Sequence, residues 1–269
     1  VRVVFNGEIY NYRELRRELE NKGHRFATSS DTEVIVHLWE ELGPRFATRL
    51  NGMFAIALHD LKKRRVVLAR DHVGIKPLYY AFHSGTLVFG SEVKVLLASG
   101  LLPRELDIDA LGQYLAWEYV PGEATLLQHV RKLRAAEMLE LDLSTGCKRV
   151  SRYWDVPTPE RVDHASAAEW EEEVDATVHA CVKRQLVSDV PLGAFLSGGV
   201  DSSLVVAAMG QGARTFSIGF DDPSYNEVPW SKRVANSLGV VHRVEIITPQ
   251  VVDLFHRLMH FMDDPIADF

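Results

Sequence analysis

The segment Ser197–Ser203, which reads Ser-Gly-Gly-Val-Asp-Ser-Ser, constrains the fold of this 269-residue chain more than any other feature. An apolar run over residues 191–196 precedes it, and another over residues 204–209 follows it. This order predicts a strand, a glycine turn and a helix, because two adjacent glycines allow a tight turn whose amides stay unobstructed. The start of the helix would direct unpaired N–H groups and the positive end of its dipole at the turn. The segment therefore predicts a phosphate-binding site.

The residues around the glycines distinguish this turn from a Walker loop. The chain contains no G-x-x-x-x-G-K-[ST] pattern, and no lysine follows directly on the glycines. Asp201 and the hydroxyls of Ser197, Ser202 and Ser203 stand there instead. That grouping suits a pyrophosphate that leaves as a unit with Mg²⁺, with Asp201 near the metal. The alternative is a serine and aspartate cap of the helix alone, but the complete seven-residue string favours nucleotide binding.

A second signal lies at residues 3–11, where an apolar strand is expected to run into a polar turn. Asn6 and Gly7 could offer a side-chain amide and a backbone N–H to one developing oxyanion, as acyl transfer requires. Glu8 would then meet a substrate ammonium group. Asp31, in the sequence Ser-Asp-Thr-Glu, stands where a helix N-cap belongs, and the local sequence by itself favours capping.

The loop at Ser197–Ser203 resembles the pyrophosphate loop (PP-loop) of the ATP pyrophosphatases, which adenylate a carboxylate or carbonyl and release pyrophosphate. The order of all the motifs resembles the glutamine-hydrolysing asparagine synthetase family of the bacterial type, over essentially the whole chain. Four segments resemble its glutaminase half: Asn6–Asn11, Ser30–Glu33, Arg70–Tyr79 and Phe89–Glu92.

This resemblance implies roles for individual residues. Asn6 and Gly7 would form an oxyanion hole, and Glu8 and Asp31 would bind the glutamine amino group, which reverses the local preference for Asp31. Glu227 would lie near the acceptor substrate. The residues expected to hold ATP, with Mg²⁺ through Asp201, are Leu196, Ser197, Gly198, Gly199, Val200, Asp201, Ser202, Ser203 and Ile218. Leu196 and Ile218 would touch the base largely through backbone atoms, although a core strand position is the alternative for Ile218.

Two domains of mixed α/β and α+β class are expected. In residues 1–154, strands such as 52–59 and 65–70 joined by short turns predict antiparallel sheet, and the resemblance implies a partial N-terminal-nucleophile hydrolase fold with αββα layers. Residues 155–165 predict a linker, because of their paired prolines. Residues 166–269 predict alternating strands and helices, and the resemblance implies a partial, doubly wound ATP pyrophosphatase (adenine nucleotide α-hydrolase-like) domain.

Several local patterns give expectations about single elements. A helix from Tyr12 to Lys22 carries the capping pattern Asn11-x-x-Glu14, and Ser166–Glu169 forms a capping box that opens another helix. One face of this second helix is expected to be a core stripe: Trp170, Val174, Val178, Cys181 and Val182. The segment Arg70–Tyr79 is interpreted as a fixed turn, with a domain contact as the competing idea.

Composition excludes some classes of function. The net charge of −7 argues against a general nucleic-acid binder, and no apolar run approaches the ~18 residues of a membrane span. These features, without a secretory signal at the start, favour a cytoplasmic enzyme. Cys147 and Cys181 are interpreted as structural, and no H-E-x-x-H or paired C-x-x-C pattern marks a metal site. The run Lys62–Arg65 is interpreted as a solvated hairpin turn, and His242 is given no role.

Two departures from the family stand at the ends of the sequence. The family's glutaminase nucleophile is an N-terminal cysteine whose own α-amino group serves as base, whereas this sequence begins with Val1. The last residues, Asp263–Phe269, stop before the family's second glycine-acid motif. We therefore expect an internal piece of a longer protein that lacks glutaminase activity by itself.

The resemblance predicts a ligase of asparagine biosynthesis. Glutamine would be hydrolysed in the first domain, ammonia would pass inside the protein, and ATP would adenylate aspartate or another carboxylate acceptor, giving an amide, AMP and pyrophosphate. One alternative is a β-lactam-synthetase-like ligase, against which the retained Asn6, Gly7, Glu8 and Asp31 argue. Another is a non-catalytic glutamine or ATP sensor, against which the intact loop argues. A homodimer is compatible with the sequence, which does not determine the oligomeric state.

Overall fold

The computed structural model describes residues 1–158, 166–247 and 259–263. Contacts between Cα atoms divide the chain into two units, Val1–Thr158 with Phe255–Phe269, and Pro159–Leu254. In the described residues, no helix combines the length and the apolarity that crossing a membrane requires.

The described residues of the first unit form two antiparallel sheets. The larger sheet has the order β1-β2-β3-β7-β8, and the smaller sheet has the order β5-β4-β6. The short turn at Leu61–Arg64 joins β2 to β3 and is exposed, as expected for a solvated hairpin, while Arg65 begins β3 and is half-buried. The strands are β1 (Arg2–Ile9), β2 (Gly52–Asp60), β3 (Arg65–Arg70), β4 (Tyr79–His83), β5 (Thr86–Gly90), β6 (Arg131–Lys132), β7 (Glu137–Asp142) and β8 (Lys148–Arg152).

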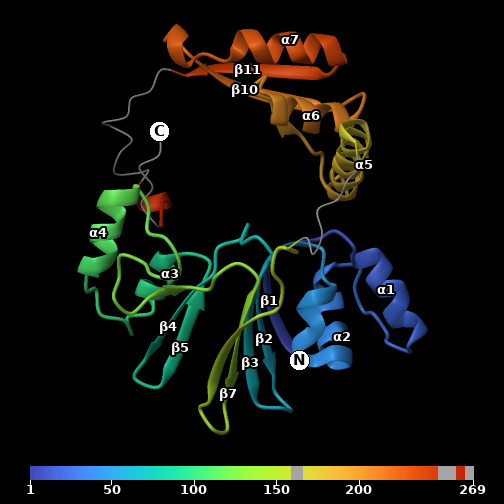
Figure 1. Cartoon of the computed structure of the whole chain (residues 1–269). Helices are drawn as coiled ribbons and strands as arrows, with labels where there is room; N and C mark the ends of the chain where they lie inside the picture. Colours follow the sequence, from blue (N-terminus) through green and yellow to red (C-terminus); the bar gives the residue numbers. More distant parts are fainter. Residues whose placement is uncertain (159–165, 248–258, 264–269) are drawn as a thin grey trace. The chain divides into compact units, whose positions relative to one another are not determined.

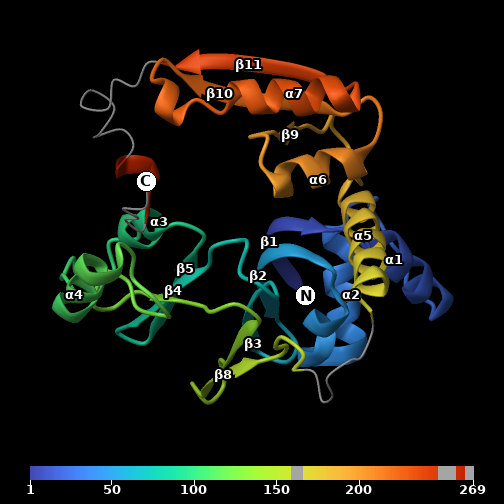
Figure 2. The ribbon, with the colours of Figure 1, turned by 45° about the horizontal axis from the view of Figure 1, so that its top comes forward.

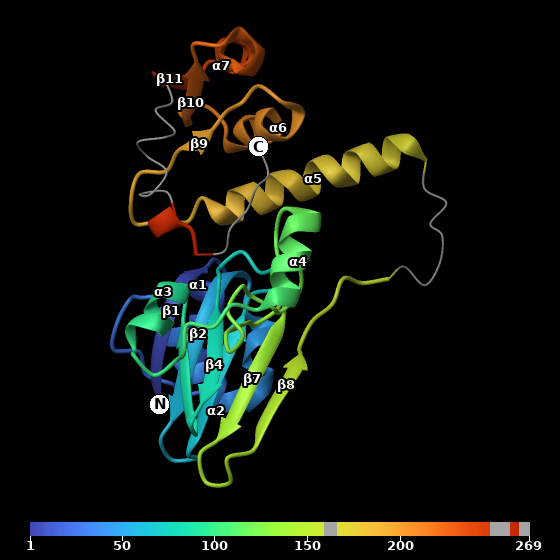
Figure 3. The same cartoon turned by 90° about the vertical axis from the view of Figure 1, so that its left-hand side faces the viewer.

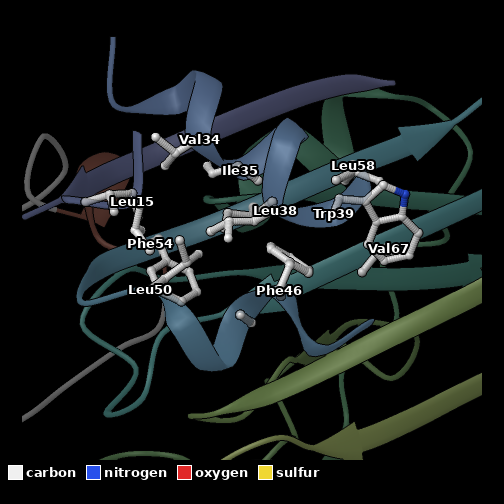
Figure 4. Close-up of a cluster of buried hydrophobic side chains, with 14 of the residues drawn as sticks. Leu15, Val34, Ile35, Leu38, Trp39, Phe46, Leu50, Phe54, Leu58 and Val67 are labelled. Carbon is white, nitrogen blue, oxygen red and sulfur yellow. The ribbon is translucent and has the colours of Figure 1, made fainter. Parts of the chain in front are cut away.

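Helices cover the outer faces of both sheets, because alternate strand residues point to opposite faces. The helices are α1 (Tyr12–Asn21), α2 (Thr32–Leu42), the 3-10 helix η1 (Gly43–Arg49), α3 (Val93–Ala98) and α4 (Ile108–Trp117). In Figure 4, Ile35, Leu38 and Trp39 of α2 lie in one buried cluster with Phe54 and Leu58 of β2.

The opposite face of the larger sheet packs on the smaller one, through Ala55, Leu68 and Leu139 against Tyr80 and Phe89. Leu96 of α3 packs with strand β4 on the far face of the smaller sheet. Figure 1 shows α1 and α2 on one side of β1–β3, and β4, β5 and α3 on the other. The expected αββα layers are confirmed.

The second unit is built from alternating strands and helices. Its described residues form three parallel strands in the order β11-β10-β9, and Figure 2 shows α7 beside β10 and β11. The elements are α5 (Ala167–Gln185), β9 (Ala194–Phe195), α6 (Val200–Met209), β10 (Arg214–Phe220), the 3-10 helix η2 (Pro223–Tyr225), α7 (Val228–Leu238) and β11 (Val241–Ile247). Parallel pairing with a helix between successive strands confirms the predicted α/β class.

Two expectations about helices were wrong. Asn11 precedes α1 but makes no side-chain cap; its amide donates to the Arg49 carbonyl at 3.0 Å and its Oδ1 accepts from the Asn51 N–H at 2.9 Å. The Ser166 capping box of α5 is present, yet no residue of α5 is buried. The predicted core stripe is therefore not a core, and Trp170 and Val174 are 43% and 53% exposed. Figure 3 shows α5 as a long helix, of which only a part can meet α6.

The two cysteines also differ from expectation. Both Cys147, after the β7–β8 turn, and Cys181, on α5, are exposed and free. A structural role for a cysteine usually depends on burial or on a disulfide. The structure gives neither side chain such an environment.

Candidate functional site

Asn6 and Gly7 lie inside strand β1, which continues to Ile9. The polar turn expected at Asn6 is therefore displaced to the residues after Ile9, because the whole segment pairs with β2. The side chain of Asn6 crosses to the segment that follows β5, where its Nδ2 donates to Ser91 Oγ at 3.1 Å. Two of the motifs that the sequence singles out are thereby joined by a direct hydrogen bond.

Gly7 allows the backbones of β1 and β2 to approach closely. Its φ is 156°, and an added Cβ would lie 2.0 Å from the Met53 carbonyl oxygen. Gly52 has the same function on β2, because an added Cβ there would lie 2.0 Å from the Glu8 carbonyl oxygen. Any side chain at Gly7 would therefore push the strand that carries Asn6 away from its neighbour.

Asp31 precedes α2 but does not cap it. Its Oδ2 accepts the backbone N–H of Ile9 at 2.9 Å, which draws the start of α2 to the end of β1. Capping, which the local sequence favoured for Asp31, was thus the wrong interpretation.

Glu8 lies two residues after Asn6 in β1 and therefore on the same face of the strand. Burial, with the charges of Glu8 and Asp71, raises the pKa of Tyr10.

The segment Arg70–Tyr79 is a fixed turn, as predicted. The buried Asp71 carboxylate accepts backbone N–H groups of Phe54, Ile75 and Lys76 at 3.1, 2.8 and 2.9 Å. The guanidinium of Arg70 donates to three carbonyls, those of Gly74, Lys76 and Leu133. Because Phe54 pairs with Gly7 in the sheet register, this turn also holds the strand against which Gly7 packs.

In the second unit, the predicted strand, glycine turn and helix are all present. The turn lies between β9 and α6, with Gly198 at a φ of 90° and Asp201 in the first helical turn. Ser197 Oγ lies 2.9 Å from Ser202 Oγ and accepts the Gly199 N–H at 3.2 Å. The hydroxyls and the helix start thus converge on one turn.

A pocket of about 200 Å³ adjoins this turn. It brings together four predicted site residues, Leu196, Ser197, Ile218 and Glu227. Ile218 is 48% exposed, so the alternative that it fills a core was wrong. The other lining residues are Phe195, Phe216 and Ser217.

Leu196 is buried and both of its backbone polar groups have partners. Its N–H donates to the Phe216 carbonyl at 2.9 Å, and its carbonyl accepts the Ser217 hydroxyl. A carbonyl oxygen has a second lone pair, which leaves that atom able to accept one further hydrogen bond.

His242, to which the sequence assigned no role, is a hydrogen-bond partner of hydroxyl groups in the second unit. It belongs to β11, where its Nδ1 lies 2.9 Å from Thr215 Oγ1 and its Nε2 lies 3.3 Å from Ser231 Oγ. Burial and the charge of Lys232 lower the pKa of this imidazole. The sequence did offer one sign of this contact. Thr215 and Ser217 alternate with apolar residues in β10, and buried hydroxyl groups need hydrogen-bond partners.

The donors of the turn fit a nucleotide phosphate chain with its cation. Gly199 leaves the turn open, because an added Cβ there would meet only Ser197 Oγ, at 3.4 Å. The first turn of α6 supplies the positive end of a helix dipole. Asp201 supplies a carboxylate, the ligand type that Mg²⁺ prefers.

Comparisons with known proteins match two segments of the chain to two family models. Residues 1–154 match the family model described as "Glutamine amidotransferase domain", and residues 173–268 match the model described as "Asparagine synthase". Asparagine synthetase [glutamine-hydrolyzing] 1 of Bacillus subtilis is 35% identical, over 99% of this chain and 42% of that protein. Putative asparagine synthetase [glutamine-hydrolyzing] 2 of Methanocaldococcus jannaschii is 34% identical, over 99% of this chain and 52% of that protein.

The chain spans about half the length of the curated relatives that it matches. Among solved structures, glutamine phosphoribosylpyrophosphate amidotransferase from B. subtilis, complexed with ADP and GMP, aligns with a TM-score of 0.40 at 16% identity. That alignment covers 93% of this chain and 49% of the solved one. A TM-score of this size does not establish a common fold.

Proposed function

We propose that this chain, which belongs to the glutamine amidotransferase domain family, is part of a glutamine-dependent, ATP-driven asparagine synthetase. Aspartate would be activated as an acyl-adenylate and attacked by ammonia, with release of AMP and pyrophosphate. The observation that carries this proposal is the Ser197–Ser203 turn at the start of α6, in a chain whose other unit belongs to the amidotransferase family.

In the first unit, the proposal assigns glutamine binding and hydrolysis to the end of β1. Asn6 Nδ2 and the Gly7 N–H would donate to the oxyanion that develops on the glutamine amide carbon. Glu8 and Asp31 would hold the glutamine amino group by charge. Cys147 follows the β7–β8 turn and Cys181 lies on α5, so neither is part of β1, and we assign neither as the nucleophile.

In the second unit, the proposal assigns ATP to the turn and the adjoining pocket. The hydroxyls of Ser197, Ser202 and Ser203 would donate to the phosphates, and Leu196 and Ile218 would border the base. Asp201 would hold Mg²⁺, which when bound neutralises charge on the phosphates. Glu227, which lines the same pocket, would lie beside the acceptor.

A physical reason supports the union of both activities in one protein. Ammonia is mostly protonated near neutral pH, and the ammonium ion has no lone pair with which to attack the adenylate. A route inside the protein would preserve the free base. We further propose a cytoplasmic enzyme that can form a homodimer, with glutamine, ATP and aspartate as its small-molecule partners and with neither a nucleic acid nor a membrane among its partners.

The test is pyrophosphate release from MgATP by the whole protein, with aspartate and with either glutamine or ammonia as nitrogen source. We expect release with both sources, and its loss in Asp201→Ala. ATP binding without pyrophosphate release for any acceptor would identify a sensor and overturn the proposal. Release over many turnovers that needs neither nitrogen source would point instead to a ligase that closes an amide within one molecule.

A further inference from the structure

Two histidines of the first unit meet at their ring nitrogens. His24 lies in the segment after α1 and His37 lies on α2, and their Nδ1 atoms are 3.0 Å apart. Both side chains are largely buried, with exposed fractions of 15% and 14%. The ring centroids are 4.8 Å apart at an interplanar angle of 58°, so the contact is not a stacked pair.

Glu40 completes a triangle with these two nitrogens. Its Oε2 lies 3.2 Å from His37 Nδ1 and 3.7 Å from His24 Nδ1. Around a tetrahedral zinc ion with bonds of about 2.0–2.1 Å, neighbouring ligand atoms lie about 3.3 Å apart. The three separations, 3.0, 3.2 and 3.7 Å, bracket that value. Two imidazoles and one carboxylate are also a ligand set that zinc uses in proteins.

The outer nitrogens of both histidines face carboxylates. His24 Nε2 lies 3.1 Å from Glu41 Oε1, and His37 Nε2 lies 3.7 Å from Glu33 Oε1. His37 Nε2 is buried and lacks a hydrogen-bond partner in the described structure. A histidine that binds a metal through one nitrogen typically directs the other at a carboxylate, which orients the ring. Glu33 is itself fixed by the N–H groups of Ala27 and Thr28, each at 2.7 Å.

We propose that His24, His37 and Glu40 bind one divalent transition-metal ion, with Zn²⁺ as the ion of choice and the fourth position open to water. The ion joins the segment after α1 to α2 and thereby fixes the loop that leads to Asp31. Within the described residues, His, Cys, Asp and Glu side chains form a group of this kind only here. The site belongs to the first unit alone and does not depend on the proposed function.

The test is titration of the chain with Zn²⁺, in a C147S/C181S background because exposed thiols also bind zinc. We expect one ion per chain and a rise in Tm on binding. Glu40→Gln should lower the affinity at least about tenfold. Glu41→Gln changes the carboxylate that faces His24 Nε2 and also accepts from Lys22, and it should lower the affinity about tenfold. The Glu40 side chain is 47% exposed, so its replacement leaves the fold intact.

The matched control is His129→Gln. His129 also pairs with a histidine, His83, at a centroid distance of 5.7 Å, and with a carboxylate, Glu105, at 3.3 Å. Its replacement should leave the Zn²⁺ affinity unchanged, whereas His24→Gln and His37→Gln should abolish binding. Equal affinity in the parent and Glu40→Gln, or an equal loss in His129→Gln, overturns the proposal. If a histidine variant fails to fold, the Zn²⁺ affinities of Glu40→Gln and Glu41→Gln still test the proposed site.

Discussion

The carboxylate of Asp31 accepts the backbone N–H of Ile9 at 2.9 Å and so joins the start of α2 to the end of β1. Asn6, three residues earlier on β1, donates to Ser91 across the two sheets. Residues far apart in the sequence thus gather along one strand. The proposed glutamine site depends on β1, which is held in place by Asp31 at Ile9 and by Ser91 at Asn6.

Asp31→Asn tests the charge that the proposal assigns to this residue. The amide oxygen can still accept the Ile9 N–H, so the fold should be retained, but the attraction for the glutamine ammonium group is lost. We expect kcat/KM for glutamine to fall roughly 30-fold, corresponding to about 2 kcal/mol. The measurement compares glutamine-dependent with ammonia-dependent synthesis by the whole protein; an equal fall in both would contradict the assignment.

Asn6→Ala removes one of the two proposed oxyanion donors. Loss of one such donor costs about 10²–10³ in kcat, so glutamine hydrolysis should fall by that factor while ammonia-dependent synthesis continues. Ser91→Ala is the matched control, because it removes the hydrogen-bond partner of Asn6 and leaves the donor itself. A comparable loss in Ser91→Ala would assign Asn6 a purely structural role.

Gly198→Ala and Gly199→Ala form a pair that tests the turn. A Cβ at Gly198 would lie 2.6 Å from the backbone of Trp230 and Ser231, at a φ of 90° that disfavours side chains. We expect Gly198→Ala to lower the free energy of unfolding by about 1–3 kcal/mol and to weaken MgATP binding. A Cβ at Gly199 would meet only Ser197 Oγ, at 3.4 Å, so Gly199→Ala should have almost the same free energy of unfolding as the parent. Denaturant unfolding of both variants is the measurement.

Asp60 should make the stability of the first unit depend on acid pH. Burial alone would raise the pKa of this carboxyl, but hydrogen bonds from the Lys63 N–H and the Trp39 indole hold it below its usual value. The folded pKa is thus lower than the unfolded one, so the stabilisation is present above the unfolded pKa, about 4, and is lost as pH falls through the folded pKa.

The matching variant is Asp60→Asn, which cannot ionise. We expect it to unfold about 2 kcal/mol more easily than the parent near pH 6, because a hydrogen bond to a charged group is replaced by a neutral one. The difference should shrink as pH falls below about 4. Urea denaturation over a pH series measures it, and a difference that stays constant across the series would speak against Asp60 as the source.

Local patterns were enough to predict much of the fold. The β-branched run Arg214–Phe220, the hairpin over residues 52–70 and the glycine turn at Ser197–Ser203 all form as expected, because near neighbours in the chain decide them. The motifs were also enough to identify the family. The capping box at Ser166 likewise depends on residues that are three positions apart.

Side-chain partners from distant segments were decided only by the tertiary structure. Asn11 and Asp31 carry the residue types of helix caps, yet both bond to other elements, since a cap has a value of only about 1 kcal/mol and a better-placed donor replaces it. The stripe on α5 has core periodicity, but burial requires a facing element that periodicity cannot specify. The meeting of His24, His37 and Glu40 follows from how the loop folds back onto α2, for which the sequence has no short motif.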